Sequence, residues 1–136
     1  MDSSTGYAGR PLVKKLGIKS GMTVFFSQPP AHYLELLGPL PEELHFLELD
    51  EPADFIHHFE TSESNLKRDF PELKDLIKKT GTLWISWPKK ASKMTSDLSD
   101  GIVRKIGLEG GLVDTKVCAV DKDWSALKFM YRTKDR

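Results

Sequence analysis

Apolar residues follow two alternating patterns along the chain, and each pattern predicts one kind of secondary structure. Continuous apolar runs are typical of strands buried on both faces, and apolar positions three or four residues apart are typical of helices. The runs predict strands over residues 22–27, 44–49, 54–60 and 82–88, then a hairpin formed by DTKVCAV and ALKFMYR. The spaced positions predict helices over residues 10–18, 31–38, 61–79 and from about 96 to 110. This alternation predicts a three-layer α/β fold with a mostly parallel sheet and a C-terminal antiparallel hairpin.

Turn and capping residues refine the bounds of these helices. Gly17 and Gly38 end the first two, because glycine readily adopts the left-handed conformation that follows a helix. Pro71 predicts an interruption of the third helix, since proline removes a backbone donor. Ser96 or Asp97 predicts the start of the fourth helix. The apolar positions of this helix are expected to face the core: Ile102, Val103, Ile106 and Leu108.

The chain of 136 residues has the size of one domain, and we expect a flexible arm over residues 1–9 and a single α/β domain over 10–136. Its 20 Lys and Arg residues balance its 20 Asp and Glu residues, so the total charge favours neither nucleic acid nor membrane as a partner. A single cysteine, Cys118, allows no internal disulfide and no cysteine-based zinc site. We also find no segment of signal-peptide type, and we expect a cytoplasmic protein.

Several segments resemble the class I S-adenosylmethionine (SAM)-dependent methyltransferase fold. KKLGIKSGMTVFF is similar to the helix and turn that lead into its first strand, and ADFIHHF is similar to its fourth strand. IKKTGTLWISWPK is similar to its fourth helix and fifth strand, and the segment from DLSDGIVRKIG to SALKFMYR is similar to its last helix and closing hairpin. The resemblance covers residues 10–132 and implies a Rossmann-like, methyltransferase-like fold.

A closer resemblance is to a family of short bacterial proteins that is known only as a domain of unknown function. The segments that carry this resemblance are GYAGRPLVKKLGIKSG, GTLWISWPKK and VCAVDKDWSALKF. This resemblance implies the fold but no activity.

Two departures from the methyltransferase pattern concern the cofactor site. Methyltransferases follow the first strand with an acidic residue and a glycine-rich loop, because glycine lets the backbone approach the cofactor closely. This chain has Ser27-Gln28-Pro29-Pro30 there, and proline supplies no N–H donor.

The second departure is a short connection. Only residues 50–53 separate the second and third strands, whereas a parallel crossover needs about a dozen residues or more. The segment between strands 2 and 4, which normally covers the adenine, is therefore missing. We expect residues 44–49 to form a short edge strand in a sheet that is mixed at that edge.

His57 and His58 suggest a metal site, but neighbours on a strand point to opposite faces, so the two rings cannot bind one ion. Glu60 shares a face with His58 near the carboxyl end of the strand, where such sheets bind ligands. We expect one histidine in the core, one at the rim, and no metal. Glu48 and Asp50 follow the second strand, where the fold presents a carboxylate to the ribose. A charged turn explains these two acids better, because the rest of that site is missing.

Aromatic residues near the strand ends are expected to be core residues. Trp84 and Trp87 lie in an apolar strand, although Trp87 stands at its carboxyl end, a position that can line a cleft. Trp124 is expected in the turn of the hairpin, either exposed as a contact surface or folded back on the sheet. Cys118 is expected to be a buried, inert thiol.

Three lysines, Lys89, Lys90 and Lys93, precede the predicted start of the fourth helix. Lysines beside open helix N–H groups can hold an anion, but Asp97 would oppose it. A solvated surface loop explains these lysines better, because such loops commonly carry lysine.

Three functions are consistent with these patterns. The chain is a non-catalytic methyltransferase-like domain that serves as a protein-interaction or regulatory module, a domain that binds a nucleotide or other small anionic ligand, or a divergent SAM-dependent methyltransferase. We favour the first, with no catalytic residue and no cofactor, and SAM is the cofactor to test. The residues expected to bind a ligand under the second are Ser27, Gln28, Glu48, His58, Trp87, Lys89 and Lys90.

Overall fold

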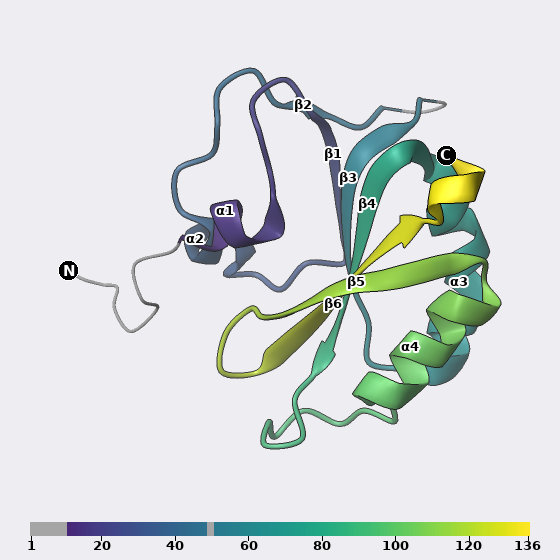
Figure 1. Ribbon diagram of the computed structural model, residues 1–136. Coiled ribbons are helices and arrows are strands. Elements are labelled where there is room, and N and C mark those ends of the chain that lie inside the picture. Colours follow the sequence, from purple (N-terminus) through teal and green to yellow (C-terminus); the bar gives the residue numbers. More distant parts are fainter. Residues whose placement is uncertain (1–10, 49–50) are drawn as a thin grey trace.

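The computed structural model describes residues 11–48 and 51–136 and shows a sheet with helices on both faces (Figure 1). Helices α1 (Leu12–Leu16) and α2 (Tyr33–Leu37) cover one face, and α3 (Glu63–Leu76) and α4 (Asp100–Glu109) cover the other. The strands are β1 (Thr23–Ser27), β2 (His45–Phe46), β3 (Ala53–Phe59), β4 (Ile77–Pro88), β5 (Leu112–Ala119) and β6 (Trp124–Tyr131). A short 3-10 helix, η1 (Thr133–Asp135), follows β6. The predicted arm over residues 1–9 lies outside the described residues.

The strands of the described chain form one sheet in the order β2-β1-β3-β4-β6-β5. Neighbours from β2 to β4 pair in parallel, and β6 pairs antiparallel with both β4 and β5. The predicted α/β fold with a C-terminal antiparallel hairpin is thereby confirmed. Parallel pairing brings the carboxyl ends of β1, β3 and β4 to the same edge of the sheet, where ligands bind in folds of this kind.

Strand β2 is shorter than predicted. Only His45 and Phe46 pair with β1, and they pair in parallel with its first two residues, Thr23 and Val24. The chain therefore leaves β2 close to the end of the sheet where β3 begins, so a short link can join the two strands. A longer parallel strand would end at the opposite edge and would need a crossover connection. The expected short edge strand is confirmed, but the mixed pairing expected at this edge is wrong.

The sheet separates two apolar cores because side chains along each strand alternate between its faces. Leu83, Ile85 and Trp87 of β4 pack toward α3 and α4, whereas Trp84 packs toward α1 and α2. Trp124 does not lie in the hairpin turn but begins β6. It is 6% exposed, and its ring packs edge-on against Phe59 with 5.1 Å between ring centroids.

Helix α3 continues through Pro71, contrary to the predicted interruption. Buried residues on both sides of the proline, Leu66, Phe70 and Leu73, hold the helix against the sheet. The helix ends at Leu76 rather than near residue 79, because Ile77 already pairs with Ala53 of β3.

Helix α4 begins at Asp100 and not at Ser96 or Asp97. The Ser99 side chain caps it by accepting a hydrogen bond from the Ile102 N–H at 3.3 Å. Val103 and Ile106 are buried as predicted, but Leu108 is 39% exposed. Within residues 11–48 and 51–136, no helix combines the length and the apolar character that crossing a membrane requires.

Gly107 allows α4 to approach the ring of Phe129 on β6. A Cβ atom at Gly107 would lie 2.0 Å from Phe129 Cε1, and Phe129 is fully buried. We expect Gly107→Ala to lower the free energy of unfolding by about 1–3 kcal/mol, because a packed core does not accommodate the added methyl group.

The matched control is Gly101→Ala in the same helix, where a Cβ atom would have no neighbour within 4 Å. This substitution should leave the free energy of unfolding unchanged or raise it by up to about 1 kcal/mol. Urea unfolding of both variants measures the difference, and equal stabilities would contradict the close packing of α4 on β6.

Candidate functional site

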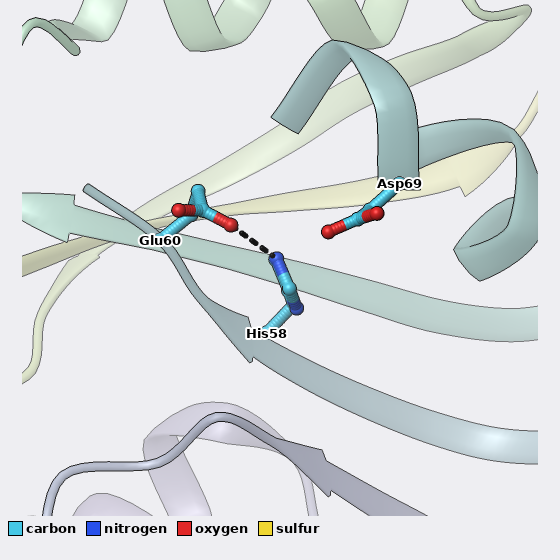
Figure 2. A group of neighbouring side chains, drawn as sticks. All are labelled: His58, Glu60 and Asp69. Carbon is cyan, nitrogen blue, oxygen red and sulfur yellow. Dashed lines mark hydrogen bonds and ion pairs between the residues drawn. The ribbon is translucent and has the colours of Figure 1, made fainter. Parts of the chain in front are cut away.

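Polar side chains meet where β1 and β3 end and α3 begins. Ser27 is the last residue of β1, and parallel pairing places it directly beside His58 of β3. Gln28 and Glu60 follow the two strands, and Asp69 reaches the same place from α3. Figure 2 shows His58, Glu60 and Asp69 facing one another. We call these five residues the carboxyl-end cluster.

Glu60 is the buried centre of this cluster and is 5% exposed. Its Oε2 accepts hydrogen bonds from the backbone N–H groups of Thr61 at 3.0 Å and Ser62 at 3.2 Å. Its Oε1 accepts a hydrogen bond from the Gln28 side-chain amide and lies 3.3 Å from Nε2 of His58. These donors compensate the loss of water around a buried carboxylate, which is otherwise costly. Glu60 thereby ties the start of α3 to the ends of β1 and β3.

His58 is buried, with partners at both ring nitrogens. Nδ1 lies 2.7 Å from Ser27 Oγ, and Nε2 faces Glu60. Because a carboxylate can only accept, we assign the ring hydrogen to Nε2 and let the Ser27 hydroxyl donate to Nδ1. Burial lowers the pKa of His58, against the opposing effect of the Glu60 carboxylate, so the ring is neutral at pH 7. The histidine expected at the rim therefore lies inside the protein, 2% exposed.

Asp69 is a site residue that the sequence did not reveal. Its carboxylate is half-buried, and the ligand-type atoms of Asp69, His58 and Glu60 all lie within 4.8 Å of one another. Arg68 pairs with Asp69, with 2.9 Å between Nε and Oδ1, and this hydrogen bond lowers the pKa of Asp69. No sequence spacing connects residue 69 to residue 58, because their contact depends on how α3 packs across β3.

Gln28 takes the backbone conformation that glycine usually supplies in such a turn. Its φ is 55°, in the left-handed region that non-glycine residues rarely adopt. Its side-chain amide donates to the carbonyl of Phe59 at 2.9 Å and to Glu60 Oε1 at 3.3 Å. The side chain thus bridges the ends of β1 and β3, and these bonds offset the strain of the turn.

His57 points to the opposite face of the sheet, as the alternation along β3 predicted. Its Nδ1 lies 2.6 Å from the Tyr33 hydroxyl of α2, and its Nε2 lies 2.7 Å from Ser86 Oγ of β4. Complete burial lowers the pKa of His57 to about 3, with a smaller contribution from His58. The ring is therefore a neutral link between α2 and the sheet, and no part of the cluster on the other face.

The remaining predicted ligand residues lie apart from the carboxyl-end cluster or within the core. Glu48 is exposed in the link after β2, where its N–H donates to Glu51 Oε1 at 2.9 Å. Trp87 shares the face of His58 but is a core residue, 5% exposed. Asp50 lies outside the described residues.

Lys89 and Lys90 lie in the loop after β4, beside the turn of the final hairpin. The Lys89 N–H donates to the carbonyl of Asp123 at 2.8 Å. The helix start predicted beside these lysines is absent, and Asp97 instead accepts a hydrogen bond from the Glu63 N–H of α3 at 2.7 Å. An open hollow of about 550 Å³ adjoins the two lysines and is lined by Ala91, Ser92, Lys93, Met94, Lys122 and Asp123.

Comparison with solved structures identifies the fold in which these residues lie. A SAM-dependent methyltransferase from Aquifex aeolicus is similar with a TM-score of 0.64 at 18% identity, covering 88% of this chain and 87% of that one. The fold is that of the SAM-dependent methyltransferases. Magnesium protoporphyrin IX methyltransferase from Synechocystis, solved with bound S-adenosylhomocysteine (SAH), has a TM-score of 0.61 at 11% identity, covering 89% of this chain and 78% of that one. No protein-family model matches the sequence, and no curated protein matches it.

Fibrillarin from Aeropyrum pernix, solved with natively bound SAM, shares the methyltransferase fold at a TM-score of 0.58 and 10% identity, covering 83% of this chain and 68% of that one. The TM-scores establish a common fold, and at identities of 10–18% the likeness extends to the fold alone.

The residues at the end of β1 do not fit the usual cradle for SAM. Pro29 and Pro30 follow Gln28 and offer no backbone N–H groups. The Gln28 side chain extends to β3 in the place where a glycine loop leaves room for the cofactor. Strand β2 lies beside only the first two residues of β1, and the acid that the structure describes after it, Glu48, lies in the link to β3.

Two substitutions separate the hydrogen bonds of Gln28 from its backbone strain. Gln28→Ala removes both bonds and keeps a side chain at positive φ, so we expect the free energy of unfolding to fall by about 1 kcal/mol. Gln28→Gly removes the same bonds but relieves the strain, and it should lower the free energy of unfolding by less. Urea unfolding of both variants measures these effects. An alanine variant as stable as the native protein would show that the bridge from β1 to β3 contributes nothing.

Proposed function

We propose that this protein is a non-catalytic methyltransferase-like domain that acts as a protein-interaction or regulatory module. The observation that supports this proposal most is the bridge from Gln28 to Phe59 and Glu60, which connects the ends of β1 and β3. In the methyltransferase fold the cofactor contacts the loop after the first strand, and here that loop is committed to bonds within the protein.

Two further features support the same proposal. The prolines remove the backbone donors that would face a ligand at this turn. The described acid after β2, Glu48, lies in the link that returns to β3 and not beside Ser27. A methyl-transfer site needs a preorganised cofactor and an oriented acceptor, and the combined changes remove the residues that perform the first task.

A divergent SAM-dependent methyltransferase is the second candidate, and the structural neighbours favour it. The Synechocystis and Aeropyrum proteins carry SAH and SAM on this fold, and the likeness to the Aquifex protein spans most of both chains. On this alternative, the cofactor would displace the Gln28 side chain.

Binding of a small anion is a third candidate, favoured by the basic loop after β4. Lys93 and Lys122 line the open hollow, and Lys89 and Lys90 adjoin it. Asp123 also lines the hollow and opposes an anion there.

Isothermal titration calorimetry with SAM and SAH tests the proposal. We expect no binding tighter than about 1 mM, because prolines replace backbone donors at the turn after β1 and the Gln28 side chain is bonded across it. The Aquifex methyltransferase, titrated in parallel, shows that the ligand preparation is active. Micromolar binding of SAM by this chain would contradict the proposal and favour the divergent enzyme.

The same titrations with ATP and inorganic pyrophosphate address the anion candidate. If either anion binds the native protein but not a Lys93→Ala, Lys122→Ala double variant, the anion-binding function is favoured over the proposed interaction module. Binding that this variant keeps would not be a property of the hollow.

A further inference from the structure

We propose that His58, Glu60 and Asp69 bind a divalent first-row metal ion, with zinc as the preferred ion. The proposal rests on the positions of three side chains and is independent of the function proposed above. All three residue types are common metal ligands, and their ligand-type atoms lie within 4.8 Å of one another (Figure 2).

The distance between the two buried ligands also matches that between two ligands of one ion. Nε2 of His58 and Oε1 of Glu60 are 3.3 Å apart, whereas an N–H···O hydrogen bond is usually about 2.9 Å long. Zinc binds nitrogen and carboxylate oxygen at about 2.0–2.1 Å, and tetrahedral geometry then places two ligand atoms about 3.3–3.4 Å apart. The present separation of these two atoms therefore needs little change for both to bind one ion.

In each of the two buried ligands, one polar atom is held by a partner within the protein. The other polar atom, Nε2 of His58 or Oε1 of Glu60, is the one that would bind the ion. Ser27 Oγ lies 2.7 Å from Nδ1 of His58, and two backbone N–H groups hold Oε2 of Glu60. Metal-binding histidines and carboxylates usually have such second partners, which fix their orientation. The Ser27 hydroxyl can donate or accept, so when the ring hydrogen moves from Nε2 to Nδ1 the bond to Ser27 is kept with its direction reversed, and the metal replaces the bond from Nε2 to Glu60.

Asp69 supplies the third ligand and the route of access. It is half-buried on α3, and its partner Arg68 has a side chain that is 67% exposed. Arg68 donates to both oxygens of Asp69, from Nε to Oδ1 at 2.9 Å and from Nη2 to Oδ2 at 3.3 Å. Water screens the exposed guanidinium end of this pair, so Asp69 can turn toward an ion at a modest cost. Two carboxylates and a neutral imidazole balance the charge of a divalent cation, and water completes a tetrahedral site.

The alternative is a cluster that only stabilises the fold, with His58 and Glu60 bonded to each other. The two accounts differ at Asp69, which has no role in the hydrogen bonds between β1 and β3. Asp69 is also partly exposed, so its substitution should leave a folded protein, whereas substitution of His58 would open the core.

The test is titration of the untagged, metal-free protein with Co²⁺, followed by displacement with Zn²⁺. We expect one ion per chain with the visible absorption of four-coordinate Co²⁺, and a rise in melting temperature with Zn²⁺. Asp69→Asn should weaken binding by about tenfold or more, since the loss of even a second partner typically weakens binding by 10–100-fold. Asp75→Asn, which changes an exposed acid on the same helix, should bind as the native protein does.

Substitution of Arg68 tests the opposite effect, a gain in metal affinity. Arg68→Met frees Asp69 and should strengthen binding by about two- to fivefold, the equivalent of an exposed ion pair. Lys67→Met, which removes a charge paired with Glu63, should leave the affinity unchanged.

Three results would overturn the proposed site. One is the absence of the Co²⁺ spectrum in the native protein, and the second is equal affinity in Asp69→Asn and Asp75→Asn. The third is a thiolate-to-metal charge-transfer band, which would place the ion at Cys118. Circular dichroism of each variant confirms that the fold is retained.

Discussion

The buried carboxylate of Glu60 is the constraint on which the carboxyl edge of this sheet depends. A carboxylate away from water must be surrounded by donors, and Glu60 obtains them from three separate parts of the chain. The backbone at the start of α3, the Gln28 amide after β1 and the His58 ring of β3 all point at it. Loss of this one acid would leave Gln28 without one of its two acceptors and the first turn before α3 without its anchor.

The methyltransferase fold persists here around an edge that is built differently. The strand order, the flanking helices and the closing hairpin are those of the fold, whereas the loop after β1 has become part of the internal hydrogen-bond network. Gln28 keeps the left-handed backbone of a glycine position and uses its side chain to bridge two strands. The same turn brings Ser27 and Gln28 into a compact polar group with His58 and Glu60.

Sequence patterns predicted most strands and helices of the fold, but they predicted the carboxyl-end cluster only in part. Continuous apolar runs located β1, β3 and β4, because strands buried on both faces leave a signal in every residue. The alternation along β3 placed His57 and His58 on opposite faces, and the proline pair marked the altered turn. The start of α4 and the length of β2 were missed. Asp97 accepts a hydrogen bond from the Glu63 N–H at the start of α3, a contact between distant parts of the chain, and Ser99 caps α4 in its place. The length of β2 depends on how far the chain stays beside β1, which the apolar run does not reveal. Asp69 was missed for the same reason, because helix packing alone brings it to His58.

The carboxyl edge depends most directly on a His58 ring that is buried, neutral and hydrogen-bonded from Nε2 to Glu60. Long-range ¹H–¹⁵N correlation spectra of the metal-free, ¹⁵N-labelled protein at pH 7 report the protonation of each ring nitrogen. The account predicts a single neutral tautomer for His58 with its hydrogen on Nε2, in slow exchange with water. A charged ring, or a neutral ring that averages rapidly between both tautomers, would contradict it.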